Sequence, residues 1–222
     1  MAQPEEKVDF QFPDMQWGFA HRFLVSPLQV RLTPELLTEF QAHVEAECNN
    51  PARMRGDRFL AGRIRQGEQV GTTESIPLKF KILFCKLGRH YVMQLGAANG
   101  IEINPQVQVS YAESWIVKSR AGDYNPAHKH TGQLSGIVYT KVPPQVADPT
   151  NGDGKLQFLF GNLREESIDF LGARQVVPVV GDLYVFPAWL THLVYPFEGE
   201  GERISYSFNL FVRNILPADH SS

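Results

Sequence analysis

The sequence predicts a mainly β protein, a jelly-roll barrel with N-terminal helices packed on one of its faces. Downstream of about residue 105, the chain consists of short segments rich in β-branched and aromatic residues, separated by turn formers. Upstream of that point, apolar residues recur at the spacing of amphipathic helices. Strands and helices do not alternate, which argues against a parallel α/β sheet. We expect a single domain over residues 1–222, with a helical support region at 1–105 and the jelly-roll core at 106–215.

Two helices are expected in the first part. Thr33, Pro34 and Glu35 form a helix start, because a capping hydroxyl is followed by a proline at the first helical position and an acid near the positive dipole end. A second helix is expected from about Leu78 to Leu95, where leucines and a tyrosine recur every four residues, with Asn99-Gly100 as the stop. The polar stretch from residue 49 to 75 between them is interpreted as loop or mobile structure.

About eight strands are expected in the second part, the number found in a jelly roll. Seven are predicted from β-branched and aromatic composition, and a short eighth is placed around His128 to His130. The seven segments are residues 107–117, 134–142, 155–160, 174–180, 182–186, 192–196 and 203–212.

Composition and charge limit the possible functions. Hydrophobic residues make up 43% and charged residues 20% of the 222, as in an ordinary globular protein. A formal net charge of −3 gives no reason to expect a nucleic-acid or anionic-membrane partner. The two cysteines, Cys48 and Cys85, match no zinc or redox spacing and are interpreted as free thiols of a reducing compartment. With no apolar run of membrane-spanning length and no signal-peptide profile at the N-terminus, we expect a cytoplasmic protein. The oligomeric state is open.

The segment from residue 114 to 139, SWIVKSRAGDYNPAHKHTGQLSGIVY, contains the strongest candidates for chemistry. His128 and His130 are two residues apart, a spacing that puts both side chains on one face of a strand. His192 follows a later strand and could complete one face of a metal site. Three protein ligands that leave positions open are typical of non-haem iron oxygenases. The alternative is that the first two are incidental on a solvated edge strand and the third is a core histidine.

Arg203 is the next candidate, in the strand segment ERISYSF. It is flanked by Ile204, Tyr206 and Phe208, so we expect an inward-pointing guanidinium that needs a carboxylate partner. Asp182 or Glu113 could supply one within the protein, and a ligand carboxylate is the alternative. Ser205 lies on the same face and could donate one more hydrogen bond.

Three patterns together resemble the 2-oxoglutarate/Fe(II)-dependent oxygenases of bacteria and phages, which are distant relatives of the prolyl hydroxylases. They are G-x-x-N-x-x-H-x-H followed by LSG-x-x-Y, then G-D-L with FP-x-W-L-x-H, then ER-I-S-x-S-F-N. The resemblance spans about Gln106 to Val212 and implies a double-stranded β-helix, Fe(II) as metal and 2-oxoglutarate as cosubstrate. It gives His128 and His192 the role of metal ligands. The implied cosubstrate residues are Arg203, which would grip the far carboxylate, with Ser205, Tyr139, Asn125 and Asn209.

His130 departs from the wider superfamily, which has a carboxylate at this position. We favour His130 as a true ligand in a three-histidine face, because its spacing already directs it at the metal. In the alternatives, Asp123 or Asp153 reaches in from a loop, or water takes the third position, as in halogenases that lack the acid.

The expected activity is that of an oxidoreductase, a dioxygenase that hydroxylates a C–H bond and releases succinate and CO2. Two other functions stay open. One is a cupin-like three-histidine dioxygenase that does not use 2-oxoglutarate, and the other is a jelly-roll binding module without catalysis. The sequence does not name a substrate, and a small-molecule or peptidyl one is expected by analogy with the prolyl hydroxylases.

Overall fold

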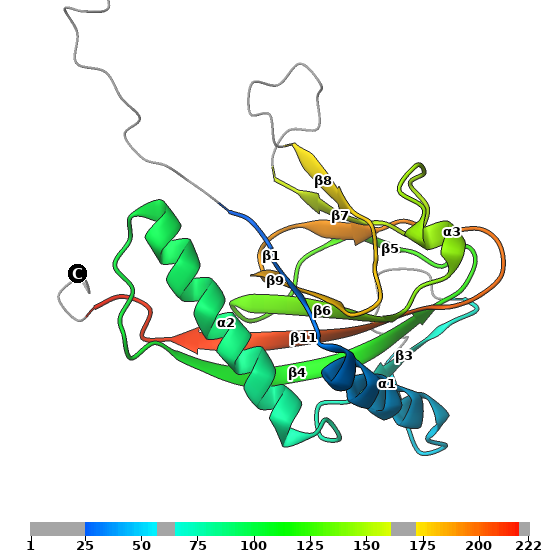
Figure 1. Cartoon of the computed structure of the whole chain (residues 1–222), viewed down its shortest axis with the longest axis horizontal. Coiled ribbons are helices and arrows are strands. Elements are labelled where there is room, and N and C mark those ends of the chain that lie inside the picture. The colour runs from blue at the N-terminus through cyan, green and yellow to red at the C-terminus, as the bar shows by residue number, and fades with distance from the viewer. Residues whose placement is uncertain (1–24, 57–64, 161–171, 218–222) are drawn as a thin grey trace, which may run out of the picture.

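A computed structural model describes residues 25–56, 65–160 and 172–217 of the chain. Two antiparallel sheets lie face to face, and two long helices cover the outer face of the larger one (Figure 1). This is the expected mainly β architecture, a double-stranded β-helix with helices on one side. Within the described ranges, no helix is long and apolar enough to cross a membrane.

The larger sheet has seven strands in the order β1-β9-β6-β11-β4-β3-β2. Its two longest members, β4 and β11, pair antiparallel along almost their whole length. The strands are β1 (Leu28–Arg31), β2 (Met54–Arg55), β3 (Glu68–Gly71), β4 (Gln108–Ser119), β6 (Leu134–Lys141), β9 (Asp182–Pro187) and β11 (Arg203–Arg213).

The smaller sheet has four strands in the order β5-β10-β7-β8 and contributes two of the expected histidines. His192, in the centre of this sheet, pairs with His128 on one side and Phe158 on the other. The strands are β5 (Asn125–His128), β7 (Leu156–Leu159), β8 (Ala173–Val176) and β10 (His192–Val194).

The helices begin and end where local chemistry requires. In α1 (Pro34–Asn49), the hydroxyl of Thr33 accepts the backbone N–H of Leu36, which satisfies a free donor at the helix start. Helix α2 (Leu78–Asn99) ends at Gly100, whose φ of 68° is the left-handed conformation that glycine adopts without strain. A one-turn helix, α3 (Pro144–Ala147), lies in the connection between β6 and β7.

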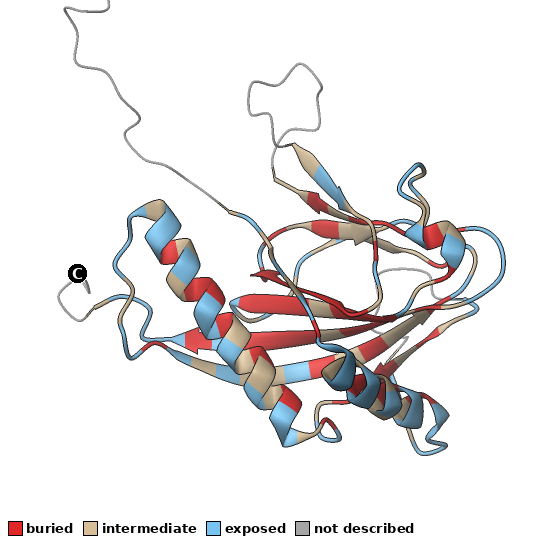
Figure 2. Cartoon of the chain, viewed as in Figure 1, coloured by how far each residue is buried: buried red, intermediate tan, exposed pale blue. Residues whose placement is uncertain are grey.

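Side chains alternate along β11, and this alternation separates the core from the site. Tyr206, Phe208 and Leu210 point to the helices and join a core that both helices share with the outer face of the larger sheet. Figure 2 shows the matching pattern on the helices, buried toward the sheet and exposed outward. The intervening residues of β11 face the space between the two sheets, where a second apolar cluster lies.

All eight expected strands are present, and so are both long helices. The expected loop from residue 49 to 75 is wrong in part, because β2 and β3 lie in it and extend the larger sheet beyond β4. β3 has only four residues, EQVG, a polar sequence that is stabilised by pairing with β4 and not by its own propensity. Residues 1–24 of the predicted helical support region lie outside the described residues.

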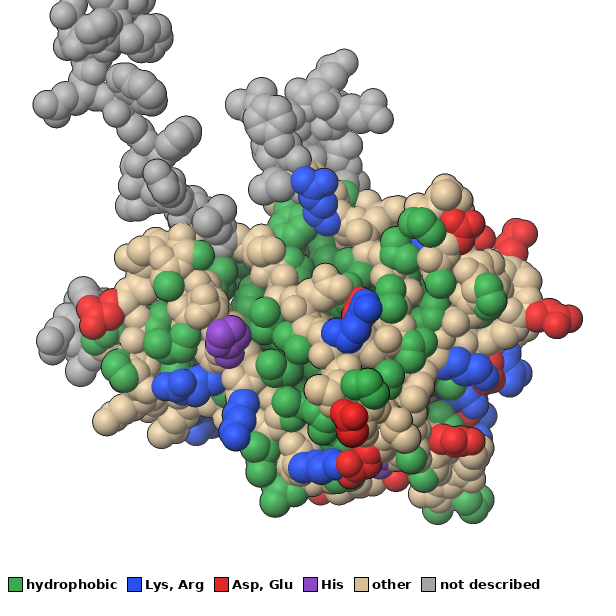
Figure 3. All heavy atoms as spheres, viewed as in Figure 1, with side chains coloured by type: hydrophobic (Ala, Val, Ile, Leu, Met, Phe, Trp, Pro, Cys, Tyr) green, Lys and Arg blue, Asp and Glu red, His purple; other side chains and the backbone are tan. Residues whose placement is uncertain are grey.

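Charged side chains are distributed without a dominant sign. On the face that Figure 3 shows, Lys and Arg are interspersed with Asp and Glu. This distribution agrees with the small net charge of −3. A single-sign surface that would attract a polyanion is not visible on this face.

Candidate functional site

Three histidines converge between the two sheets. One ring nitrogen of each of His128, His130 and His192 lies within 4.8 Å of one from each of the others. The Nε2 atoms of His130 and His192 are 3.1 Å apart, close enough for two neutral rings to share a proton or a metal. Among the described residues, these three histidines are the one group of three or more His, Cys, Asp or Glu side chains that could hold a metal. The group includes no carboxylate.

The backbone orients two of the three rings. Nδ1 of His128 is 2.7 Å from the carbonyl oxygen of Pro126, and Nδ1 of His192 is 2.9 Å from that of Leu190. An Nδ1–H that donates to a carbonyl leaves the lone pair on Nε2, and in His192 this is the nitrogen that lies 3.1 Å from Nε2 of His130. Such a backbone contact is the usual support of a metal-binding histidine.

His130 reaches the cluster by another route than the one expected. Strand β5 ends at His128, so His130 lies in the following loop and does not share a strand face with it. Its position is fixed by its backbone N–H, which donates to the carbonyl of Ala188 at 3.0 Å. The ring is also packed beside Trp115, with centroids 5.4 Å apart. The proximity of His130 to the other rings is therefore as expected, but its physical cause is a loop contact.

The cluster is electrostatically set to stay neutral. Burial lowers the pKa of His130 to about 3, with further lowering from His192 and His128. Burial and the neighbouring His128 lower the pKa of His192 to about 4. Burial also lowers the pKa of His128. Neutral imidazoles keep the lone pair that a metal needs, so the donor set is ready for a cation at neutral pH.

Arg203 is buried in the same cavity and has no carboxylate partner in the part of the chain that the structure describes. Its exposed fraction is 4%. Nη1 donates to the carbonyl of Gly154 at 2.8 Å, and Nη2 donates to the hydroxyl of Ser119 at 3.1 Å. Nε has no hydrogen-bond partner among the described residues. Burial lowers the pKa of Arg203, while the Coulombic effects of Tyr139 and Asp123 oppose this.

Neither expected internal partner pairs with Arg203. Asp182 accepts from Arg31 at 2.7 Å and from Gln29 at 2.9 Å. Glu113 accepts from the amide of Asn209 at 2.8 Å. The buried guanidinium is thus held by two neutral oxygens and keeps a free donor, the arrangement that a ligand carboxylate would complete.

The cavity wall comes from regular strand register. Ser119, Val117 and Trp115 on β4 stand opposite Arg203, Ser205 and Ser207 on β11, and all six line the cavity. Sequence reasoning did not single out most of these β4 and β11 residues. The signal that could have found them is the two-residue alternation of β4, read against that of β11. The remaining lining residues are Tyr124, Asn125, His128, His130, Gly136, Ile137, Leu156, Phe186, His192 and Val194.

The other expected cosubstrate residues divide into two groups. Ser205 and Asn125 line the cavity, and the amide of Asn125 lies 3.3 Å from Nε2 of His128. Tyr139 and Asn209 do not line it. Tyr139 is 1% exposed in the core between the sheets, and Asn209 accepts from Ser135 while it donates to Glu113. Burial raises the pKa of Tyr139, and the nearby guanidinium of Arg203 opposes this.

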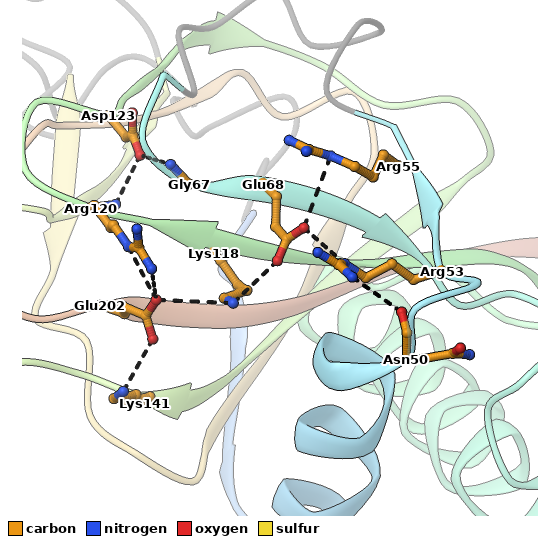
Figure 4. A network of polar contacts seen from close by, with 10 residues as sticks. All are labelled: Asn50, Arg53, Arg55, Gly67, Glu68, Lys118, Arg120, Asp123, Lys141 and Glu202. Carbon is orange, nitrogen blue, oxygen red and sulfur yellow. Dashed lines mark hydrogen bonds and ion pairs between the residues drawn. The ribbon is translucent and has the colours of Figure 1, made fainter.

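Asp123 is committed elsewhere and does not approach the histidines. Its two carboxylate oxygens accept the backbone N–H groups of Arg65, Gln66, Gly67 and Arg120 at 2.7–3.2 Å. Figure 4 shows it at one end of a polar network that continues through Arg120 to Glu202. Asp153, the other acid considered as a third ligand, is likewise outside the histidine cluster.

These features define a metal site that also binds an organic acid. The three neutral imidazoles can hold the metal, and the buried arginine in the same cavity can pair with a carboxylate of the acid. Three protein nitrogens leave other metal positions open, as redox and oxygen chemistry requires.

Comparison with known proteins agrees with this kind of site. Residues 113–209 match the family described as "Putative 2OG-Fe(II) oxygenase". This range includes the three histidines and Arg203, so the part of the chain that carries the site is similar to that family. The curated proteins give no match.

Solved structures share the fold at low sequence identity. A prolyl-4-hydroxylase from Pseudomonas putida aligns with a TM-score of 0.54 at 13% identity, covering 83% of this chain and 92% of that one. HygX from Streptomyces hygroscopicus, solved with nickel, 2-oxoglutarate and hygromycin B, aligns with a TM-score of 0.55 at 12% identity. This alignment covers 84% of this chain and 83% of HygX. A prolyl hydroxylase from Trichoplax adhaerens, in complex with a peptide fragment of hypoxia inducible factor, aligns with a TM-score of 0.54 at 14% identity. This alignment covers 85% of this chain and 83% of that one.

Proposed function

We propose that this chain is a 2OG-Fe(II) oxygenase, an enzyme that uses Fe(II) and 2-oxoglutarate. It hydroxylates a C–H bond of its substrate, with His128, His130 and His192 as the ligands of Fe(II). Together with 2-oxoglutarate and O2, the iron supplies the oxidation, in which 2-oxoglutarate becomes succinate and CO2 and one oxygen atom enters the substrate. The chain's own residues bind the cosubstrate, orient it and keep water from the reacting groups.

The single observation that carries the proposal is the buried guanidinium of Arg203, which lines the histidine cavity and has only neutral hydrogen-bond acceptors among the described residues. A buried guanidinium without a carboxylate is costly, because desolvation is not repaid by an opposite charge. A dicarboxylate with one end at the histidines would bring its other end to Arg203, in the same cavity. Ser205, which lines that wall next to Arg203, is the hydroxyl we propose as a second donor to the same carboxylate.

His130 is proposed as the third ligand because its ring, and not a carboxylate, lies beside His192. With three neutral ligands, the positive charge of the metal is not offset by the protein. The dianionic cosubstrate then supplies all the local negative charge, so metal and 2-oxoglutarate should bind cooperatively.

Metal binding tests the ligand set without depending on turnover. The experiment is anaerobic calorimetric titration of the purified protein with Ni²⁺ or Mn²⁺ in place of iron. His128→Ala, His130→Ala and His192→Ala should each weaken binding by at least about tenfold. The matched control is His90→Ala, because His90 is an exposed histidine on α2. An unchanged affinity in His130→Ala would remove this residue from the ligand set.

For the substrate, we propose a small molecule or a peptidyl residue. The support is the peptide in the Trichoplax neighbour and the kinship with prolyl hydroxylases. A screen for increased 2-oxoglutarate consumption, with free amino acids in one arm and proline-containing peptides in the other, separates these two classes. No stimulation in either arm would contradict both. The free thiols Cys48 and Cys85 support a reducing, cytoplasmic location, also as a proposal.

A further inference from the structure

An apolar pocket of about 630 Å³ lies outside the histidine site. It opens where the C-terminal end of α2, the end of β11 and the start of β1 lie on the same side of the molecule (Figure 1). Its walls are almost entirely apolar, unlike the histidine site. The lining residues are Val25, Tyr91, Val92, Leu95, Gly96, Asn99, Ile101, Ile103, Gly132, Gln133, Leu134, Pro187, Trp189, Val212, Ile215 and Leu216.

The rim of this pocket exposes large hydrophobic side chains. Trp189 is 58% exposed, Ile101 51% and Leu216 48%. Single exposed apolar residues are normal on a protein surface, but a contiguous set around one hollow marks a surface that something covers. The pocket therefore needs an occupant that is itself apolar.

The segment immediately before the pocket has the composition that fits it. Residues 10–24, FQFPDMQWGFAHRFL, contain five aromatic residues in 15 positions, whereas the whole chain is 11% aromatic. The preceding nine residues, MAQPEEKVD, are mostly polar. Val25 itself lines the pocket, so residue 24 is attached at its edge. Such tethering gives the segment an effective concentration in about the millimolar range, an advantage that a second copy lacks.

We propose that residues 10–24 of the same chain dock in this pocket and cover its apolar walls. The aromatic side chains supply the buried area. The proposal concerns packing alone and does not depend on the metal or on catalysis.

The docked segment would also support the loop that carries His130. Gln133 lines the pocket, and its carbonyl accepts the backbone N–H of Ala188 at 2.9 Å. The carbonyl of Ala188 in turn accepts the backbone N–H of His130 at 3.0 Å. Covering this side of the loop should therefore slow opening of these two hydrogen bonds.

Photo-crosslinking of the full chain tests the occupant. A photoreactive phenylalanine analogue replaces Trp17 in one variant and Phe19 in another, with Glu5 as the matched polar position. We expect the first two to attach within one chain to peptides from residues 91–103, 132–134, 187–189 or 212–216, and the Glu5 variant to give far less product there. Attachment to another face, or to a second copy as a covalent dimer, would overturn the proposal.

A rim substitution gives the second readout. Ile101→Asp places a charge at the pocket rim and should reduce the crosslink yield several-fold. Its control is Ile82→Asp, because Ile82 is 46% exposed on α2 and does not line the pocket. In the full chain, the double variant Trp17→Ala with Phe19→Ala should speed hydrogen exchange at Ala188 and His130, whereas Glu5→Ala with Glu6→Ala should not. Equal crosslink yields for both aspartate variants, or unchanged exchange, would count against docking.

Discussion

Replacing Arg203 with methionine separates a ligand-binding role from a structural one. Arg203 is 4% exposed, and within the described ranges its guanidinium donates to the carbonyl of Gly154 and the hydroxyl of Ser119. Methionine fills a similar volume with an unbranched apolar side chain, so the exchange removes the charge and its hydrogen bonds with little change in packing.

The expected effect on stability is small. The guanidinium's desolvation penalty is several kcal/mol, and its two hydrogen bonds to neutral acceptors contribute about 1.5–3 kcal/mol each. These opposing amounts nearly cancel. We therefore expect the free energy of unfolding of the ligand-free protein to fall by less than about 2 kcal/mol, or to rise.

The expected effect on 2-oxoglutarate is large. Removing one partner of a buried charge pair costs about 2–5 kcal/mol, so affinity for 2-oxoglutarate should fall at least about 30-fold. The assay is anaerobic titration of metal-loaded protein with 2-oxoglutarate, alongside urea unfolding of the metal-free protein. Arg213→Met is the control, because Arg213 is exposed on the same strand.

Two results would refute this reasoning. If Arg203→Met lowers the free energy of unfolding by far more than about 2 kcal/mol, the guanidinium is a structural element whose two hydrogen bonds outweigh its desolvation. If the folded variant binds 2-oxoglutarate as tightly as the wild type, Arg203 does not hold the cosubstrate.

Three further predictions concern the scaffold. Gly136→Ala should lower the free energy of unfolding by about 1–3 kcal/mol, because a Cβ there would lie 2.1 Å from the buried ring of Phe208; chemical denaturation measures this. Thr33→Ala should cost about 1 kcal/mol through loss of the α1 cap, visible in the same assay. Glu202→Gln should cost about 1 kcal/mol at pH 7. The hydrogen bond from Arg120 holds the pKa of Glu202 below its ordinary 4.5. This stabilisation is therefore fully present above pH 4.5 and is lost as the pH falls through the lower pKa of the folded state. Urea titrations at pH 7 and pH 3.5 should show the difference between wild type and this variant shrinking at the lower pH.

Local sequence patterns were sufficient for most strands of the second part and for the helix ends. Seven of its eight strands follow from composition and turn residues, and Thr33 and Gly100 mark helix ends by their side-chain and backbone chemistry. The face of α2 that packs on the sheet was harder to predict from the sequence. The leucine and tyrosine series at four-residue spacing lies beside the true centre, where Gly88 allows close approach. A Cβ at Gly88 would be 2.6 Å from the side chain of Leu210, and a small residue of this kind gives no hydrophobic signal.

The site could be predicted only in part, because contacts between segments distant in the sequence position its residues. The three histidines could be proposed from spacing, but His130 is positioned by Ala188, which is 58 residues away in sequence (188 − 130). Ser119 faces Arg203 only through the register of β4 and β11, which no local pattern specifies. For the same reason, Asp182 and Glu113 were reasonable partners for Arg203 from their chemistry and are engaged elsewhere in the fold.

The most direct test of the central claim is anaerobic addition of Fe(II) and then 2-oxoglutarate to the purified protein, followed by visible absorption. If the three histidines hold the iron and Arg203 holds the far carboxylate, a metal-to-ligand charge-transfer band should appear and saturate at one equivalent. The band should be lost in His192→Ala and should need much more 2-oxoglutarate in Arg203→Met. The absence of any band in the wild type, together with no succinate on admission of O2, would contradict the account.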